Sequence, residues 1–268
     1  MLSGILDLKE NRMPDNPAYR LHWLLEKLLA YKALPLSGDT TRQAIGHALL
    51  SRGPQILDGD YDEDSALYDV FELQQLIHEI LAWIKVRDFD HELFKRPVER
   101  LWAGIMGIDP GSPWESTKKK LDPADVRSLL YLSHEFDKES KRNAQLLDQE
   151  EMTDLVTEVD ALYEAVQASD MPEDVKTFIL EQLAVIKHAI RVYPYEGYDS
   201  LRQALQQNIG AMLLFKERLD EVSDDYAEVG RLKVVMRHLS NVVSKAADVI
   251  SIAQPVITYL LGGGQPPK

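Results

Sequence analysis

The stretch "SALYDVFELQQLIHEILAWIKV", residues 65–86, decides the class of fold. Its apolar residues recur at helical spacing and cover more than one face of the helix: Leu67, Val70, Phe71, Leu73, Leu76, Ile77, Ile80, Leu81, Trp83 and Ile84. A helix that is apolar around so much of its circumference is typical of a central, largely buried position. The stretch therefore predicts a helical protein built around this one helix.

Helical spacing also dominates the rest of the chain, and no alternating strand pattern is flanked by hairpin turns. Further helices are expected at about 17–33, 40–51, 88–108, 123–168 with a polar interruption at 137–143, 173–190, 201–219 and 231–254. The helix at 88–108 should be interrupted at Pro97, because proline lacks the backbone N–H that a helix interior needs. The predicted class is all-α, a multi-helix bundle of about eight helices, in one body or as two packed helical halves.

The longest loop-like segment, "DPGSPWESTKKKLDP" at 109–123, is the expected boundary between the two halves. This division predicts an N-terminal helical half at 1–110 and a C-terminal helical bundle at 121–255. Residues 256–268 form a third part, an apolar plug followed by a flexible Gly/Pro tail.

Composition excludes several classes of function. The 268-residue chain has a formal net charge of −14, which disfavours unspecific nucleic-acid binding. It contains no cysteine, which removes disulfides and thiolate ligands and fits a reducing cytoplasm. The N-terminus does not have the pattern of a signal peptide, and the uncharged C-terminal stretch is shorter than the roughly 20 apolar residues that span a bilayer. We expect a cytoplasmic protein without a transmembrane span.

An acidic stretch precedes the central helix and is the nearest approach to a metal motif. Four aspartates alternate along it: Asp58, Asp60, Asp62 and Asp64. They match positions 1, 3, 5 and 7 of a calcium loop, but the turn glycine is replaced by Glu63 and the final glutamate by Asp69. The interpretation adopted is a helix cap, with a weak divalent site as the alternative.

Histidine patterns give no strong metal or catalytic signature. The pairs at 78–79, 91–92 and 134–135 read His-Glu, but none continues into His-Glu-x-x-His. Glycine loops for phosphate and nucleophile elbows are also missing, so no cofactor is expected and the chain is not predicted to be an enzyme.

The strongest enzymatic alternative rests on arginine–histidine spacing. Three pairs fit an Arg-x4–6-His pattern: Arg42/His47, Arg127/His134 and Arg231/His238. The pattern resembles the motif of HEPN ribonucleases, which are also helical, and it implies phosphate binding by arginine and proton transfer by histidine. In "RSLLYLSH" the two residues share one helix face, so Arg127 and His134 are the catalytic candidates if this alternative holds.

A second resemblance covers residues 170–210, "DMPEDVKTFILEQLAVIKHAIRVYPYEGYDSLRQALQQNIG". It is similar to a pattern found in uncharacterised bacterial helical proteins. The likeness contains no catalytic signature and implies no activity.

The sequence thus favours a bacterial, non-enzymatic interaction protein, a regulatory or accessory subunit that binds a protein partner or itself. The predicted partner-binding residues follow Pro255 and form the apolar plug: Val256, Ile257, Tyr259, Leu260 and Leu261. Two alternatives stay open. One is the HEPN-like ribonuclease or toxin of a bacterial defence-type system, and the other is a peripheral membrane protein that uses its C-terminal segment.

Truncation after Gln254 should remove association but leave the helical fold intact. Each large aliphatic side chain of the plug would forfeit about 1.5–3 kcal/mol if left in water, so the plug should dock on a partner. Circular dichroism, thermal melting and light scattering on the two chains provide the comparison. If the full chain is monomeric and the truncated chain has a much lower melting temperature, the plug belongs to the core of its own chain.

Overall fold

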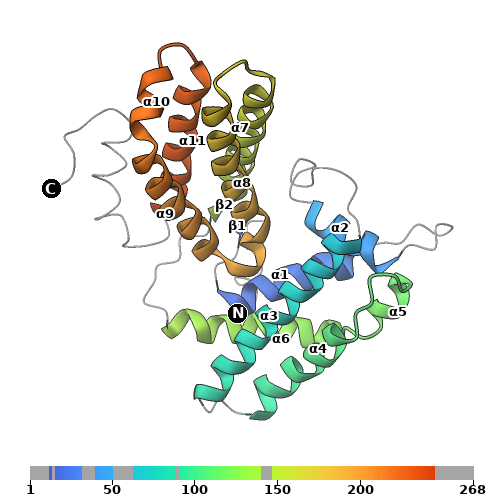
Figure 1. Ribbon diagram of the computed structural model, residues 1–268. Coiled ribbons are helices and arrows are strands. Elements are labelled where there is room, and N and C mark those ends of the chain that lie inside the picture. The colour runs from blue at the N-terminus through green and yellow to red at the C-terminus, as the bar shows by residue number, and fades with distance from the viewer. Residues whose placement is uncertain are drawn as a thin grey trace. The chain divides into compact units, whose positions relative to one another are not determined.

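The computed structural model describes residues 12–13, 16–31, 40–50, 63–87, 91–139 and 147–244 (Figure 1). The chain forms two compact units. The N-terminal unit comprises Pro14–Lys141 and Pro194–Gly197, and the C-terminal unit comprises Met1–Met13, Arg142–Tyr193 and Tyr198–Lys268. The predicted all-α class is confirmed. The described residues contain eleven α-helices, more than the eight or so expected.

The described residues of the N-terminal unit form six α-helices and one π-helical turn. In chain order they are α1 (Pro17–Ala30), α2 (Thr41–Leu50), α3 (Glu63–Arg87), η1 (His91–Lys95), α4 (Arg96–Met106), α5 (Trp114–Lys118) and α6 (Pro123–Glu139). α1 packs along both α6 and α3, and α4 also packs against α3 and α6. α2 lies against α1 and α3. The interruption expected at Pro97 is confirmed, because η1 ends immediately before the proline-containing first turn of α4.

α3 supplies much of the core of the N-terminal unit. Besides Ala66, six of its larger apolar side chains are buried: Val70, Leu73, Leu76, Ile77, Ile80 and Ile84. The prediction of a largely buried helix is too broad in one respect, because Leu67 and Phe71 each expose about half of their surface. They lie near the start of the helix, where the surrounding helices leave part of its circumference uncovered.

The segment expected to be a boundary loop belongs instead to the N-terminal core. Trp114 is 1% exposed and begins the short helix α5, and Leu121 is also buried in the same cluster. The hydroxyl of Thr41 lies 2.8 Å from that of Thr117, and the Thr41 N–H donates to Ser112 O at 2.9 Å. These bonds fasten the segment to the start of α2. The division between the units falls between Lys141 and Arg142, later than the predicted boundary.

The C-terminal unit contains the remaining helices. They are α7 (Gln149–Ala168), α8 (Glu173–Glu196, of which the last turn belongs to the N-terminal unit), α9 (Tyr198–Leu214), α10 (Lys216–Val222) and α11 (Ala227–Ser244). A short antiparallel pair, β1 (Arg12–Met13) and β2 (Leu147–Asp148), joins the beginning of the chain to this unit. α8 continues through Pro194, and the chain turns at Gly197, whose φ of 68° favours glycine.

Apolar residues at three-and-four spacing are buried in this unit. On α7 they comprise Met152, Leu155, Val159, Leu162 and Val166, and on α8 Ile179, Leu183, Ile186 and Ile190. On α11, Leu232, Val235, Met236, Leu239, Val242 and Val243 are buried, and the helix packs against α7 and α9. The part of the last helix up to Ser244 therefore completes the core of its own unit.

Ion pairs on the surface of the C-terminal unit link neighbouring helices. Arg218 donates from Nε to Asp174 Oδ2 at 2.7 Å and from Nη1 to Glu221 Oε2 at 2.9 Å. The hydrogen bond from Arg218 lowers the pKa of Asp174. The pair orients α10 against α8. It contributes little to the stability of the fold, because both side chains reach solvent.

Alanine at Gly104 should destabilise the protein by about 1–3 kcal/mol, the usual effect of overpacking. A Cβ there would lie 2.6 Å from Lys120 O, a backbone atom that cannot move aside easily. The matched control is Gly230→Ala in α11, where nothing lies within 4 Å of the added carbon. The control should stabilise by about 0.5–1 kcal/mol. Urea denaturation measures the free energy of unfolding of both variants. Equal changes in the two variants would contradict the close approach of Gly104 to Lys120 O.

Candidate partner-binding groove

An open groove lies between η1 and α6 in the N-terminal unit. It has a volume of about 440 Å³ and is lined by Leu93, Phe94, Ser128, Tyr131, His134 and Glu135. Leu93 is 62% exposed and Tyr131 is 70% exposed. Two large apolar side chains thus stand in solvent at one concave surface.

The π-helical turn follows from the position of Pro97. In a regular α-helix the proline ring would clash with the carbonyl of the residue four positions earlier, which is Leu93. The widened turn His91–Lys95 avoids this clash before α4 begins. π-helical turns occur frequently at functional sites. Here the turn carries the two apolar residues of one groove wall, Leu93 and Phe94.

Polar contacts hold the opposite wall, α6, in place at both of its ends. Near its start, Arg100 of α4 makes a two-pronged ion pair with Asp125, with Nε 2.7 Å from Oδ2. The hydrogen bond to Asp125 raises the pKa of Arg100. Near its end, Asn16 Nδ2 donates to Asp137 Oδ1 at 2.7 Å, and the same asparagine caps α1 through Tyr19 N. α6 is therefore tied to two neighbouring helices.

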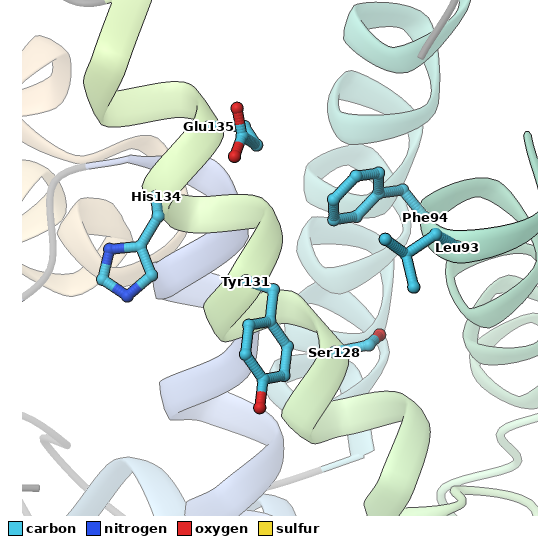
Figure 2. A pocket seen from close by; sticks show the side chains of 6 residues that line it. All are labelled: Leu93, Phe94, Ser128, Tyr131, His134 and Glu135. Carbon is cyan, nitrogen blue, oxygen red and sulfur yellow. The ribbon is translucent and has the colours of Figure 1, made fainter. Parts of the chain in front are cut away.

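Two polar groups of the groove are engaged within α6. Ser128 Oγ donates to Asp125 O at 2.6 Å, and Lys138 Nζ lies 2.6 Å from Glu135 Oε1. Figure 2 shows the ring of His134 pointing away from Leu93 and Phe94. The η1 wall therefore offers apolar contact, and the polar groups of the α6 wall do not form a converged set of acid, base and nucleophile.

Arg127 and His134 share the exposed side of α6, as their spacing predicts. His134 lines the groove and Arg127 does not. Arg127 Nε donates back to Pro123 O at 3.3 Å, toward the start of the helix and away from His134. Seven residues of helix separate the two by about 10 Å along the axis. This arrangement does not place both groups on one phosphate.

Of the other two arginine–histidine pairs, only Arg231/His238 has a histidine whose side chain is described. His238 Nδ1 lies 3.0 Å from Glu158 Oε2 of α7, so this histidine links two helices of the C-terminal unit. The side chain of His47 lies outside the described residues, so the Arg42/His47 pair stays a prediction.

The acidic stretch is described only in part. Asp58, Asp60 and Asp62 lie outside the described residues, and Asp64 is an exposed residue of the first turn of α3. Among the residues with described side chains, no group of three or more histidine or acidic side chains could hold a metal ion. The proposed cap and the weak divalent site both stay predictions.

The predicted partner-binding segment, 256–261, also lies outside the described residues. In the part of the chain that is described, no helix is both long enough and apolar enough to cross a membrane.

Sequence reasoning missed the groove itself. The sequence contained one signal of it: Tyr131 lies outside the buried stripe of α6. That stripe is formed by Val126, Leu129, Leu132 and Phe136. A contiguous exposed apolar patch indicates an interaction surface, and Tyr131 supplies the part of this patch that lies on α6. The contribution of η1 had no comparable signal in the sequence.

Comparisons with known proteins give no match for this chain. No family model, no curated protein and no solved structure is significantly similar to it.

Purified protein should not cleave RNA, because Arg127 and His134 do not converge and the chain carries a net charge of −14. Total RNA incubated with the parent and with an Arg127→Ala/His134→Ala variant should give the same intact pattern. Cleavage by the parent that is lost in the variant would establish the ribonuclease alternative. His188→Ala serves as the matched control, since this histidine is exposed on α8 and belongs to none of the three arginine–histidine pairs.

Proposed function

We propose that this protein is a non-enzymatic helical interaction protein, a regulatory or accessory subunit that binds a protein partner through the groove between η1 and α6. The proposal rests on the exposure of Leu93 and Tyr131, which leave most of their surface in solvent at the open groove between η1 and α6. Burying a large apolar side chain contributes about 1.5–3 kcal/mol, so a partner that covers both would gain substantial affinity.

The groove suits a protein segment better than a small substrate. Sites for small substrates usually contain a few polar groups that converge to orient the ligand. In this groove, Ser128 and Glu135 are already hydrogen-bonded within α6. An amphipathic helix that inserts bulky apolar side chains needs no such groups, because its apolar face supplies the affinity.

The charge of the chain supports a basic partner. A net charge of −14 attracts positively charged segments and raises their association rate. We therefore assign the groove to an amphipathic helix with large apolar residues on one face and lysine or arginine beside them. The absence of cysteine supports a cytoplasmic setting for this complex.

Charge introduced into the groove should abolish partner binding. Tagged parent protein and a Leu93→Glu/Tyr131→Glu variant are used to capture partners from a lysate of the native host, with identification by mass spectrometry. Because both side chains are exposed, the variant should keep its melting temperature within a few degrees. A partner enriched by the parent should fall at least tenfold with the variant.

The matched control is Leu214→Glu, at a leucine of α9 that is 93% exposed in the C-terminal unit. It should retain the partner at the level of the parent. If the groove variant captures the same proteins as the parent, or if no protein is enriched reproducibly by the parent, the proposal is wrong.

A further inference from the structure

Among the residues that line the groove between η1 and α6, Glu135 carries the carboxylate. About a quarter of its side chain, 26%, is exposed. Figure 2 shows the carboxylate on the side of α6 that faces Phe94, whereas the ring of His134 lies on the other side. An acidic group thus stands beside the apolar wall of the groove.

The counter-charge of Glu135 is a lysine of its own helix. Lys138 Nζ lies 2.6 Å from Glu135 Oε1, and 68% of the lysine side chain is exposed. An exposed ion pair at this spacing is weak, because water competes for both ions and a long side chain has to be held in one conformation. The lysine can therefore leave the carboxylate when another cation arrives.

Other basic side chains of the two walls are engaged elsewhere. Lys95 Nζ of η1 lies 3.5 Å from Glu99 Oε1. Arg127 of α6 donates to Pro123 O, toward the start of the helix. Glu135 itself lies four residues before the end of α6, where the carbonyl groups give a helix a partial negative charge. These features favour a positive charge of a partner at this end of the groove.

The position of Glu135 relative to Tyr131 defines a spacing. The two residues are four apart on α6 and both line the groove, so their side chains are neighbours on one face of the helix. A partner helix that lies along α6 and covers Tyr131 with a large apolar residue brings a residue one turn away to Glu135.

We propose that Glu135 determines the specificity of the groove and selects a partner helix in which lysine or arginine lies three or four residues from a large apolar residue. The cation of the partner takes the place of Lys138 on the carboxylate. This inference rests on the proposed function, because it specifies which partner helix the groove binds.

Three synthetic amphipathic peptides test the selection on the full chain. All three carry leucines on one helix face, and the position four residues from the central leucine is lysine, glutamine or glutamate. Fluorescence anisotropy measures the Kd of each peptide. The parent should bind the lysine peptide roughly tenfold more tightly than the glutamate peptide, with the glutamine peptide between them.

Two substitutions separate the roles of the ion pair. Glu135→Gln should bring the Kd values of the lysine and glutamate peptides to within about threefold of each other, because the selecting charge is removed. Lys138→Ala should strengthen binding of the lysine peptide about two- to fivefold, because the competing cation is removed.

The matched control is Glu221→Gln, because Glu221 is also paired with a basic residue three positions away, Arg218 of the C-terminal unit. It changes the net charge equally and should keep the preference of the parent. If Glu135→Gln keeps the preference, or if Glu221→Gln also loses it, Glu135 is not the specificity residue, while the docking groove itself stands. If no peptide binds the parent, or if Leu93→Glu/Tyr131→Glu binds the peptides as the parent does, the proposed function fails as well.

Discussion

Burial of α3 is the constraint on which the N-terminal unit depends. Leu76, Ile77 and Ile80 are almost fully removed from water, and no single neighbour can cover so wide an apolar surface. α1, α2, α4 and η1 all pack against this helix, and α6 packs against α1, α4 and η1. The groove lies at η1 and α6, toward the end of α3, where Val86 is exposed.

The C-terminal unit is held together differently, by narrow apolar seams on several long helices. α7 and α11 bury their three-and-four-spaced residues almost completely, which is the pattern of helix packing in bundles. The exposed ion pairs of the unit, such as Arg218 with Asp174, orient helices but do not replace the buried contacts.

Much of the helical framework could be predicted from the sequence, because apolar spacing and proline positions act locally. The start of α6 at Pro123, the interruption at Pro97 and the seam on α7 all follow from such signals. The segment around Trp114 could not be predicted, since its proline, glycine and lysine content is typical of a loop. Only tertiary packing shows that the indole is a core residue and that the segment belongs to the N-terminal unit.

The same limit applies to the candidate site. Spacing correctly placed Arg127 and His134 on one side of α6, but it could not show that the arginine turns back toward Pro123. Leu93 and Tyr131 are far apart in the sequence and meet at one groove only through the packing of η1 on α6. A docking surface formed by two separate elements has no sequence motif of its own. Sequence motifs therefore indicate reaction centres more readily than docking surfaces.

Hydrogen exchange of the protein, alone and bound to a partner captured from its host, measures where the partner binds. The partner should slow amide exchange at His91–Lys95 and along Pro123–Glu139, with little change in α9 and α11. Protection confined to the C-terminal unit, or to none of the helices, would contradict the assignment of partner binding to the groove between η1 and α6.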